Sequence, residues 1–328
     1  MIGYKDTKYY IYVCDGVINM GLFSKPEVII LKESCDSKEY LDNLQELRKT
    51  VSDNTEAAEK IDKEIAITEA GIFGEDKILF ELKNSGMDLV VIRDLFLKIG
   101  DDRSAQIDYF VITPHGVVII ECKNLFGNIE INNKGDFIRS FDYKGRWYKE
   151  GIYSPITQNE RHLAIYKECW MARRNVVAQL LFNKYFDENH KTIVVLANPK
   201  TVVNDKWAKK EVKNQVLRCD QLINYLRNMN GTASLSKKEM LDIGEAVCAL
   251  NVDVRTDYLK KFKELVETTN AQQPTTSEEQ KTQTEQKLIC PKCGGELILR
   301  TAKKGDNAGN QFYGCSNFPK CRFIMNIQ

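Results

Sequence analysis

The sequence has no long hydrophobic run and almost no net charge. No stretch approaches the roughly 18 apolar residues that a membrane span requires, so we expect no transmembrane segment. The apolar segment Lys8–Cys14 is short, and no small-residue cleavage site follows it, so we expect a cytoplasmic protein rather than a secreted one. The 47 lysines and arginines nearly balance the 46 acidic residues, which leaves a formal net charge of +1. Any surface that binds nucleic acid must therefore be a local patch.

Six of the ten cysteines are scattered along the chain without regular spacing: Cys14, Cys35, Cys122, Cys169, Cys219 and Cys248. In a reducing compartment such isolated thiols are typically small buried residues. The other four crowd the C-terminus, with Cys290 and Cys293 forming one pair and Cys315 and Cys321 the other. Four thiolates suit one tetrahedral Zn²⁺, and a site filled by sulfur is structural rather than catalytic. So few residues accompany them that the metal must supply much of the folding energy.

Hydrophobic residues are absent between Ala271 and Leu288. A segment that can bury nothing is expected to be a flexible linker. Residues 1–19 match no clear element, and Met20 begins a segment with the form of an alternative translation start. The sequence thus predicts four parts, namely an N-terminal helical extension at 1–66, a main α/β domain at 67–268, a linker at 269–287 and a zinc module at 288–328.

Helical periodicity extends from Ser37 to about Ala70, with leucines and valine recurring at threes and fours. It predicts a helical hairpin that packs against the main domain. Gly71 and Gly74 are then expected to open the next helix, where glycine lets the backbone approach a neighbour closely. A long helix is predicted over 158–183, and a later one over 236–250 is capped by Ser236 and Glu239.

β-Branched and aromatic runs predict the strands of one small mixed sheet. They lie at 28–31, 88–97, 109–112, 117–120, 127–131, 136–140, 146–149, 191–197 and 216–217. The basic residues of the 134–149 region alternate with Tyr143, Trp147 and Tyr148. They could form a surface for a phosphate backbone, although such a charge run is more often a solvated face.

Three charged residues flank the hairpin formed by the strands at 109–112 and 117–120. A turn centred between Ile112 and Val117 pairs these two residues and places Asp108 opposite Glu121. Strand alternation sends Glu121 and Lys123 to the same face. Facing carboxylates destabilise one another unless a cation lies between them, so a hard ion such as Mg²⁺ is expected here.

This arrangement resembles the active site of the PD-(D/E)xK nuclease superfamily, and the flanking residues resemble its nuclease-related domain, called NERD. Cys122 stands where many members have Thr, and Tyr109 where many have His, but neither position is an expected ligand. The resemblance covers roughly 69–162. It is carried by four pieces in order: Gly71–Glu75, Gln106–Asp108, Gly116–Lys123 with Asn124 and Gly127, and Ser154–Gln158.

The resemblance implies a restriction-endonuclease-like fold, in which helices flank a mixed sheet, and hydrolysis of phosphodiester bonds. Asp108 and Glu121 would hold Mg²⁺ or Mn²⁺, Lys123 would orient or deprotonate water, and Glu75 and Gln158 would support the site. Simpler interpretations stay open, because Glu75 could be a first-turn acid near a helix dipole and Gln158 a capping amide. His162 is expected to be structural, since the chemistry of the family does not require it.

The C-terminal segment resembles the zinc ribbon of type IA DNA topoisomerases, mainly over Phe312–Cys321. Its aromatic residues are interleaved with basic ones, which predicts binding to single-stranded or distorted DNA. The whole chain is thus expected to be a metal-dependent DNA nuclease directed by a DNA-binding ribbon. The alternatives are a non-catalytic DNA-binding or adaptor protein that retains a nuclease fold, and a ribbon that recruits protein instead. The sequence leaves the oligomeric state open. The basic residues of the C-terminal segment are Lys292, Arg300, Lys303, Lys304, Lys320 and Arg322.

Overall fold

The computed structural model describes residues 25–53, 55–253, 257–272, 290–301 and 311–326. These residues belong to two compact units, which divide between Gln273 and Pro274. The alternative start expected at Met20 and the part of the expected linker at 273–287 lie outside the described residues. No helix in the described ranges is long and apolar enough to cross a membrane.

The centre of the first unit is a six-stranded mixed sheet with the order β1-β2-β3-β4-β8-β10. Antiparallel pairing joins β2, β3 and β4, whereas β1 runs parallel to β2, and β8 parallel to β4. The apolar runs of β2 and β4 are buried on both faces, because helices cover both sides of the sheet. The strands are β1 Val28–Lys32, β2 Leu89–Ile99, β3 Arg103–Thr113, β4 Gly116–Lys123, β8 His190–Leu196 and β10 Val216–Arg218.

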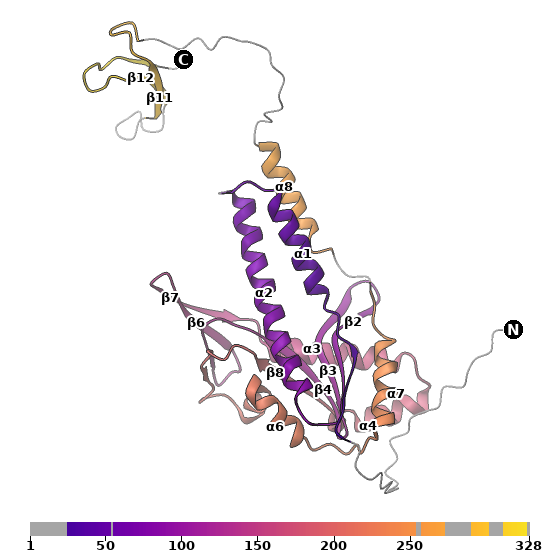
Figure 1. The fold of residues 1–328 in the computed structure, drawn as a ribbon. Helices are drawn as coiled ribbons and strands as arrows, with labels where there is room; N and C mark the ends of the chain where they lie inside the picture. Colours follow the sequence, from indigo (N-terminus) through magenta and orange to yellow (C-terminus); the bar gives the residue numbers. More distant parts are fainter. Residues whose placement is uncertain (1–24, 54, 254–256, 273–289, 302–310, 327–328) are drawn as a thin grey trace, which may run out of the picture. The chain divides into compact units, whose positions relative to one another are not determined.

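Three helices pack on one face of the sheet and two on the other (Figure 1). The first face is covered by α3 Pro155–Met171, α4 Val176–Asn189 and α7 Lys237–Cys248, and the second by α2 Glu56–Lys83 and α6 Leu222–Arg227. The mixed α/β fold flanked by helices is therefore confirmed. The single helix predicted over 158–183 is wrong. Asn175 begins a new helix after Met171, and its side chain accepts a hydrogen bond from the backbone N–H of Ala178.

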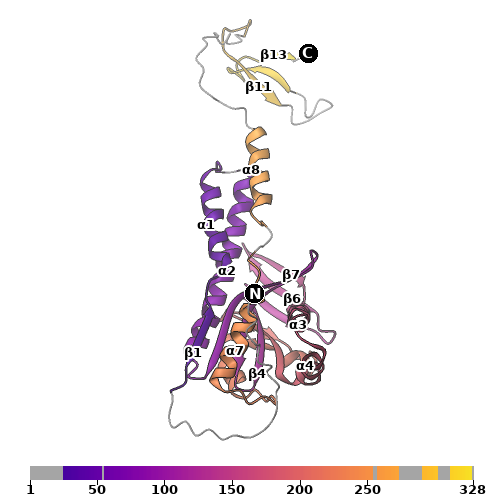
Figure 2. The ribbon, with the colours of Figure 1, turned by 90° about the vertical axis from the view of Figure 1, so that its right-hand side faces the viewer.

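The predicted helical hairpin is present as α1 Asp36–Lys49 and α2, but the expected helix start at Gly71 is wrong. α2 continues without a break through both glycines to Lys83. Its first half packs with α1 and with α8 Lys260–Gln272, and its second half packs on the sheet (Figure 2). These contacts at both ends outweigh the helix-propensity cost of about 1 kcal/mol for each glycine. α8 also covers the first four residues of the range expected as linker.

The strands predicted between 127 and 149 form a second sheet instead of extending the first. Its order is β7-β6-β5-β9, with β5 Asn128–Ile131, β6 Phe137–Tyr143, β7 Arg146–Ile152 and β9 Val203–Asn204. Its base packs on the first sheet, where Ile131 and Phe137 join a buried cluster with Val194 and Leu196. β6 and β7 form a hairpin that projects from this base (Figure 1).

The first unit also contains two short helices, α5 Lys210–Lys213 and the 3₁₀ helix η1 Cys219–Gln221.

The second unit is a three-stranded antiparallel sheet of β11 Leu297–Thr301, β12 Gln311–Cys315 and β13 Ile324–Asn326. Its small buried cluster contains Leu297 together with three of the four clustered cysteines. The unit therefore has very little apolar core of its own.

Candidate active site and zinc centre

The β3–β4 hairpin has the register that the sequence predicts. Ile112 pairs with Val117, and the ladder continues to the pair of Tyr109 and Ile120. The next position in this register is occupied by Asp108 and Glu121. There the Oδ2 atom of Asp108 accepts a hydrogen bond from the backbone N–H of Cys122 at 2.7 Å. β4 meanwhile remains paired with β8 as far as Lys123, so the charged residues lie on a firmly held strand.

Glu121, Lys123 and Gln158 are in direct contact. The side chain of Glu121 is buried, and the Nζ atom of Lys123 donates to its Oε1 atom at 2.6 Å. Lys123 also donates to Oε1 of Gln158, at 3.2 Å. The side chain of Ser154 caps α3 by accepting from the N–H of Thr157. Gln158 is therefore not the capping residue, and its amide is available to bind Lys123.

His162 is one residue that sequence reasoning set aside and that the structure brings to the cluster. It lies one helical turn after Gln158, and its Nδ1 atom is 3.4 Å from the Oε2 atom of Glu121. Both of these atoms are buried and lack a hydrogen-bond partner among the described residues. The spacing of four residues, which places His162 on the same helical face as Gln158, is the sequence signal that could have identified it.

Burial and mutual repulsion shape the charges of the cluster. Burial raises the pKa of Asp108 well above its usual range, and the charges of Glu121 and Glu75 raise it further. Burial opposes the charged form of Lys123, but the adjacent Glu121 and Asp108 raise its pKa overall. Lys123 is therefore a cation at neutral pH, and the two carboxylates compete for the positive charge that it provides.

Glu75 is not brought into this cluster. Cys122 packs under α2, whereas Val117 and Ile119 pack with α3, so Glu121 faces the α3 side of the sheet. On the α2 side, the Oε2 atom of Glu75 accepts from Nε and Nη2 of Arg93, at 3.1 and 2.9 Å. Burial raises the pKa of Glu75 despite this ion pair. The charge of Glu75 nevertheless acts on Asp108 and raises its pKa.

The two carboxylates of the cluster suit a hard divalent ion. Glu121 contributes a buried oxygen without a partner, and Asp108 a second carboxylate beside it. Among the described residues, only the cysteine cluster brings ligand atoms of three or more His, Cys, Asp or Glu residues within 4.8 Å of one another. An ion at Asp108 and Glu121 would therefore have two carboxylate ligands and take the rest from water or substrate, which is the usual coordination of Mg²⁺.

The four C-terminal cysteines converge as the sequence predicts. The sulfur atoms of Cys290 and Cys321 are 3.8 Å apart, and those of Cys293 and Cys315 are 3.3 Å apart. Tetrahedral zinc with Zn–S bonds of about 2.3 Å requires sulfur separations of about 3.8 Å. The backbone N–H of Gly295 and the Cys315 thiol lower the pKa of Cys293 to about 6, which favours the thiolate. This arrangement fits a structural zinc site.

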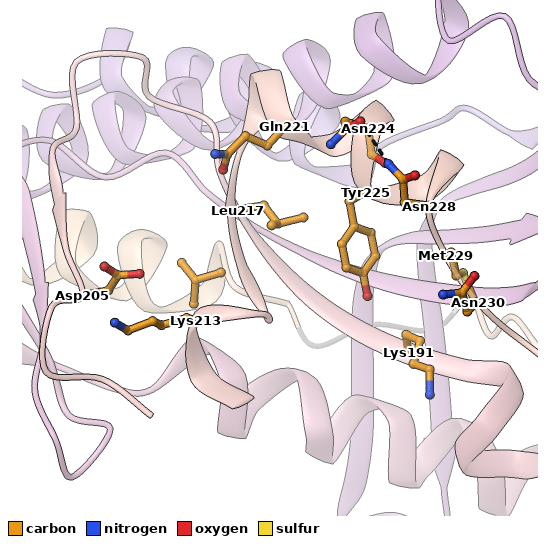
Figure 3. Close-up of a pocket in the computed structure, with 11 residues that line it drawn as sticks. Lys191, Asp205, Lys213, Leu217, Gln221, Asn224, Tyr225, Asn228, Met229 and Asn230 are labelled. Atoms are coloured by element: carbon orange, nitrogen blue, oxygen red, sulfur yellow. Dashed lines mark hydrogen bonds between the residues drawn. The ribbon is translucent and has the colours of Figure 1, made fainter. Parts of the chain in front are cut away.

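A pocket of about 550 Å³ lies beside β10 and α6 and includes none of the cluster residues (Figure 3). Two lysines that line it are bound to backbone carbonyls, since Lys191 donates to Asp187 and Lys213 to Lys206. Asn228 donates to Asn224 across the same wall. Both lysines and Asn228 are thus engaged in hydrogen bonds, and the carboxylates of the cluster lie outside this pocket.

Two family models match separate parts of the chain. A nuclease-related domain, NERD, matches residues 70–197, which include Asp108, Glu121, Lys123, Gln158 and His162. A topoisomerase DNA binding C4 zinc finger matches residues 287–328. The resemblances to NERD and to the topoisomerase zinc ribbon are therefore confirmed.

The curated relatives include DNA topoisomerases, which match over short segments. A DNA topoisomerase 1 of Archaeoglobus fulgidus is 53% identical over 36 residues, and one of Methanocaldococcus jannaschii is 49% identical over 43 residues. These matches cover 11% and 13% of this chain and 5% of each topoisomerase. A search of solved structures gives no significant match.

Proposed function

We propose that this protein is a DNA nuclease that requires Mg²⁺ or Mn²⁺ and hydrolyses phosphodiester bonds. The observation that carries the proposal is the buried Oε2 atom of Glu121, which lacks a hydrogen-bond partner among the described residues and lies beside Asp108, Lys123 and His162. A carboxylate oxygen that is left unpaired beside a second carboxylate is a suitable ligand for a divalent ion. The match to a nuclease-related domain supports the same conclusion.

Asp108 and Glu121 would hold the divalent ion, which supplies Lewis acidity and lowers the pKa of bound water. Lys123 is positioned by Glu121 and Gln158. As a cation it orients the attacking water and stabilises the negative charge that grows on the phosphate. Because its pKa is raised, this role is favoured over that of a general base. His162 lies close to the second oxygen of Glu121, with its Nδ1 atom 3.4 Å away.

Cleavage of supercoiled plasmid and labelled oligonucleotides with Mg²⁺ or Mn²⁺ tests the proposal. We expect Glu121→Gln and Lys123→Ala to lower the cleavage rate by about a hundredfold or more. Glu46→Gln and Lys49→Ala are matched controls, because they break an exposed ion pair of the same 2.6 Å length in α1. Equal rates in all variants would refute the assignment.

Calorimetric titration of the zinc-loaded protein with Mn²⁺ distinguishes the nuclease from a non-catalytic DNA-binding protein. The nuclease predicts one further divalent site, which Glu121→Gln weakens. DNA binding without cleavage and without a second metal site would instead indicate a DNA-binding protein that retains the nuclease fold.

The zinc ribbon is proposed as a second DNA-binding element. Phe318 is exposed and lies near the guanidinium of Arg300, with 6.0 Å between the ring centroid and Cζ. Such a cation and ring together suit a nucleic-acid strand. Tyr313 and Phe323 instead pack against the cysteines, and Lys303 and Lys304 lie outside the described residues. Deletion of residues 274–328 should weaken DNA binding, and unchanged affinity would favour a ribbon that recruits protein.

A further inference from the structure

A row of aromatic rings extends outward along the β6–β7 hairpin. It consists of Phe126, Phe141, Tyr143 and Tyr148 and is called the aromatic row below. Phe141 and Tyr148 are cross-strand partners with stacked rings, 5.4 Å between centroids and 16° between planes. Phe126 packs edge-on against Phe141 at 6.0 Å. Despite these contacts Phe126 is 61% exposed, Tyr143 54% and Tyr148 41%.

The aromatic row continues a face that is buried at the base of the hairpin. Phe137 and Ile152 are cross-strand partners in the cluster that packs on the main sheet. Phe141 and Tyr143 follow Phe137 at even spacings in β6, so they lie on the same face. Beyond the base this face remains exposed. A contiguous exposed patch of large rings in a soluble protein indicates a binding surface.

Gly127 joins the aromatic row to the candidate active site. It has a φ of +95°, and a Cβ atom there would collide with the backbone oxygen of Ser140 in β6. Only glycine therefore lets the chain that leaves β4 pass this close to the hairpin. As a result Phe126, three residues after Lys123, lies against Phe141. A short segment of the chain thus connects the row to the end of β4 that carries Lys123.

Positive charge borders the aromatic row. The guanidinium of Arg139 lies 4.5 Å from the centre of the Phe141 ring. Arg139 is paired with Glu150 at 2.6 Å, but its Nε atom is buried without a hydrogen-bond partner among the described residues. Lys144 and Arg146, at the tip of the hairpin, form no ion pair with a described residue. Rings flanked by such cations suit a strand that carries both phosphates and open base faces.

We propose that the aromatic row is a stacking platform for unpaired bases, so that the preferred substrate is a single-stranded segment of DNA. The proposal rests on the proposed nuclease function and specifies its substrate class. In a duplex the base faces are already stacked on one another, and side-chain rings can reach them only where the strand is unpaired. A strand lying along the row would place its next phosphates at Lys123.

Binding is measured by fluorescence anisotropy of the full-length zinc-loaded protein without Mg²⁺ or Mn²⁺, using a labelled single strand and the corresponding duplex. We expect Phe126→Leu and Tyr148→Leu to weaken single-strand binding about tenfold each and to leave duplex binding within twofold. Tyr148→Phe should retain the affinity. Phe80→Leu is the matched control, because Phe80 is an aromatic residue of α2 that is 64% exposed and lies outside the aromatic row.

Photocross-linking locates the strand independently of the ribbon. A single strand containing 5-iodouracil should cross-link to peptides that contain Phe126 or Tyr148. The proposal would be overturned if the two Leu variants lost single-strand and duplex affinity equally, or if cross-links were confined to residues 290–326. It would also be overturned if sedimentation showed a dimer that Tyr148→Lys dissociates. Specific strand binding through the row without cleavage would refute the nuclease function alone. Cleavage of both substrates at equal rates, unaffected by the two Leu variants, would refute the platform alone.

Discussion

The two glycines of α2 provide a sharp test of how this helix packs behind the candidate active site. A Cβ atom at Gly74 would lie 2.6 Å from Cβ of Asn124, 3.2 Å from Sγ of Cys122 and 3.3 Å from Cβ of Ala197. A Cβ atom at Gly71 would meet nothing within 4 Å. Both residues lie in the interior of the same helix. An alanine at either position therefore gains the same helix propensity, and only one of them is crowded.

The magnitudes follow from these contacts. Replacing glycine by alanine in a helix stabilises by about 1 kcal/mol, so Gly71→Ala should raise the free energy of unfolding by that amount. In Gly74→Ala the same gain is opposed by overpacking, because carbon atoms at 2.6 Å must separate by about 1 Å to reach normal contact. Overpacking of this kind costs about 1–3 kcal/mol. The propensity term cancels in the difference between the variants, which should be about 1–3 kcal/mol.

Urea denaturation followed by circular dichroism at 222 nm measures this difference. Gly74→Ala should also reduce DNA cleavage more than Gly71→Ala does, because the displaced Asn124 follows Lys123 directly in the chain. Free energies of unfolding that agree within about 0.5 kcal/mol would refute the packing argument, since they would mean that α2 is not pressed against β4 at Gly74.

Three further predictions concern His190, Arg93 and the zinc site. Burial lowers the pKa of His190 to about 4, whereas the histidine of the unfolded chain binds a proton below about pH 6.5. The free energy of unfolding should therefore be unaffected by this group above pH 6.5 and should fall by about 3 kcal/mol between pH 6.5 and 4. His190→Gln should flatten this part of a pH series of urea titrations. Arg93→Met leaves the partly buried Glu75 carboxylate without its cation and should cost about 3 kcal/mol or more, whereas adding Glu75→Gln should recover part of the lost thermal stability; no recovery would contradict the ion-pair argument. Colorimetric assay should find one zinc per chain, and chelation should unfold residues 290–326 while the helical signal of the first unit persists.

The features that could be predicted from the sequence are those that residues close together in the chain determine. The register of the β3–β4 hairpin follows from its turn and its alternating residues, so the positions of Asp108 and Glu121 could be predicted. The four cysteines carry their ligand spacing in the sequence. The family resemblance implied that Gln158 supports the site, but its contact with Lys123 was not predicted, since 35 residues separate the two in the chain.

The features that the sequence did not predict depend on tertiary contacts between residues that are far apart in the chain. Gly71 and Gly74 weaken a helix locally, and only packing against α1, α8 and the sheet keeps α2 continuous. Arg93 lies inside an apolar strand and has no sequence signal of its role, because its partners Glu75 and Asp76 lie in the preceding helix α2, 18 and 17 residues earlier in the chain. The separation of β5, β6 and β7 from the main sheet likewise depends on burial against Val194 and Leu196.

The continuity of α2 affects how the protein can be divided for study. Ala57, Ala58 and Ile61 at one end of the helix are buried with Phe262 and Val266 of α8, while Ile78 and Leu82 at the other end are buried under the sheet. A shortened protein that began near residue 67 would cut the helix in two and uncover the apolar side of α8. We expect such a fragment to aggregate. Residues 25–272 should behave as the smallest soluble fragment that contains the cluster.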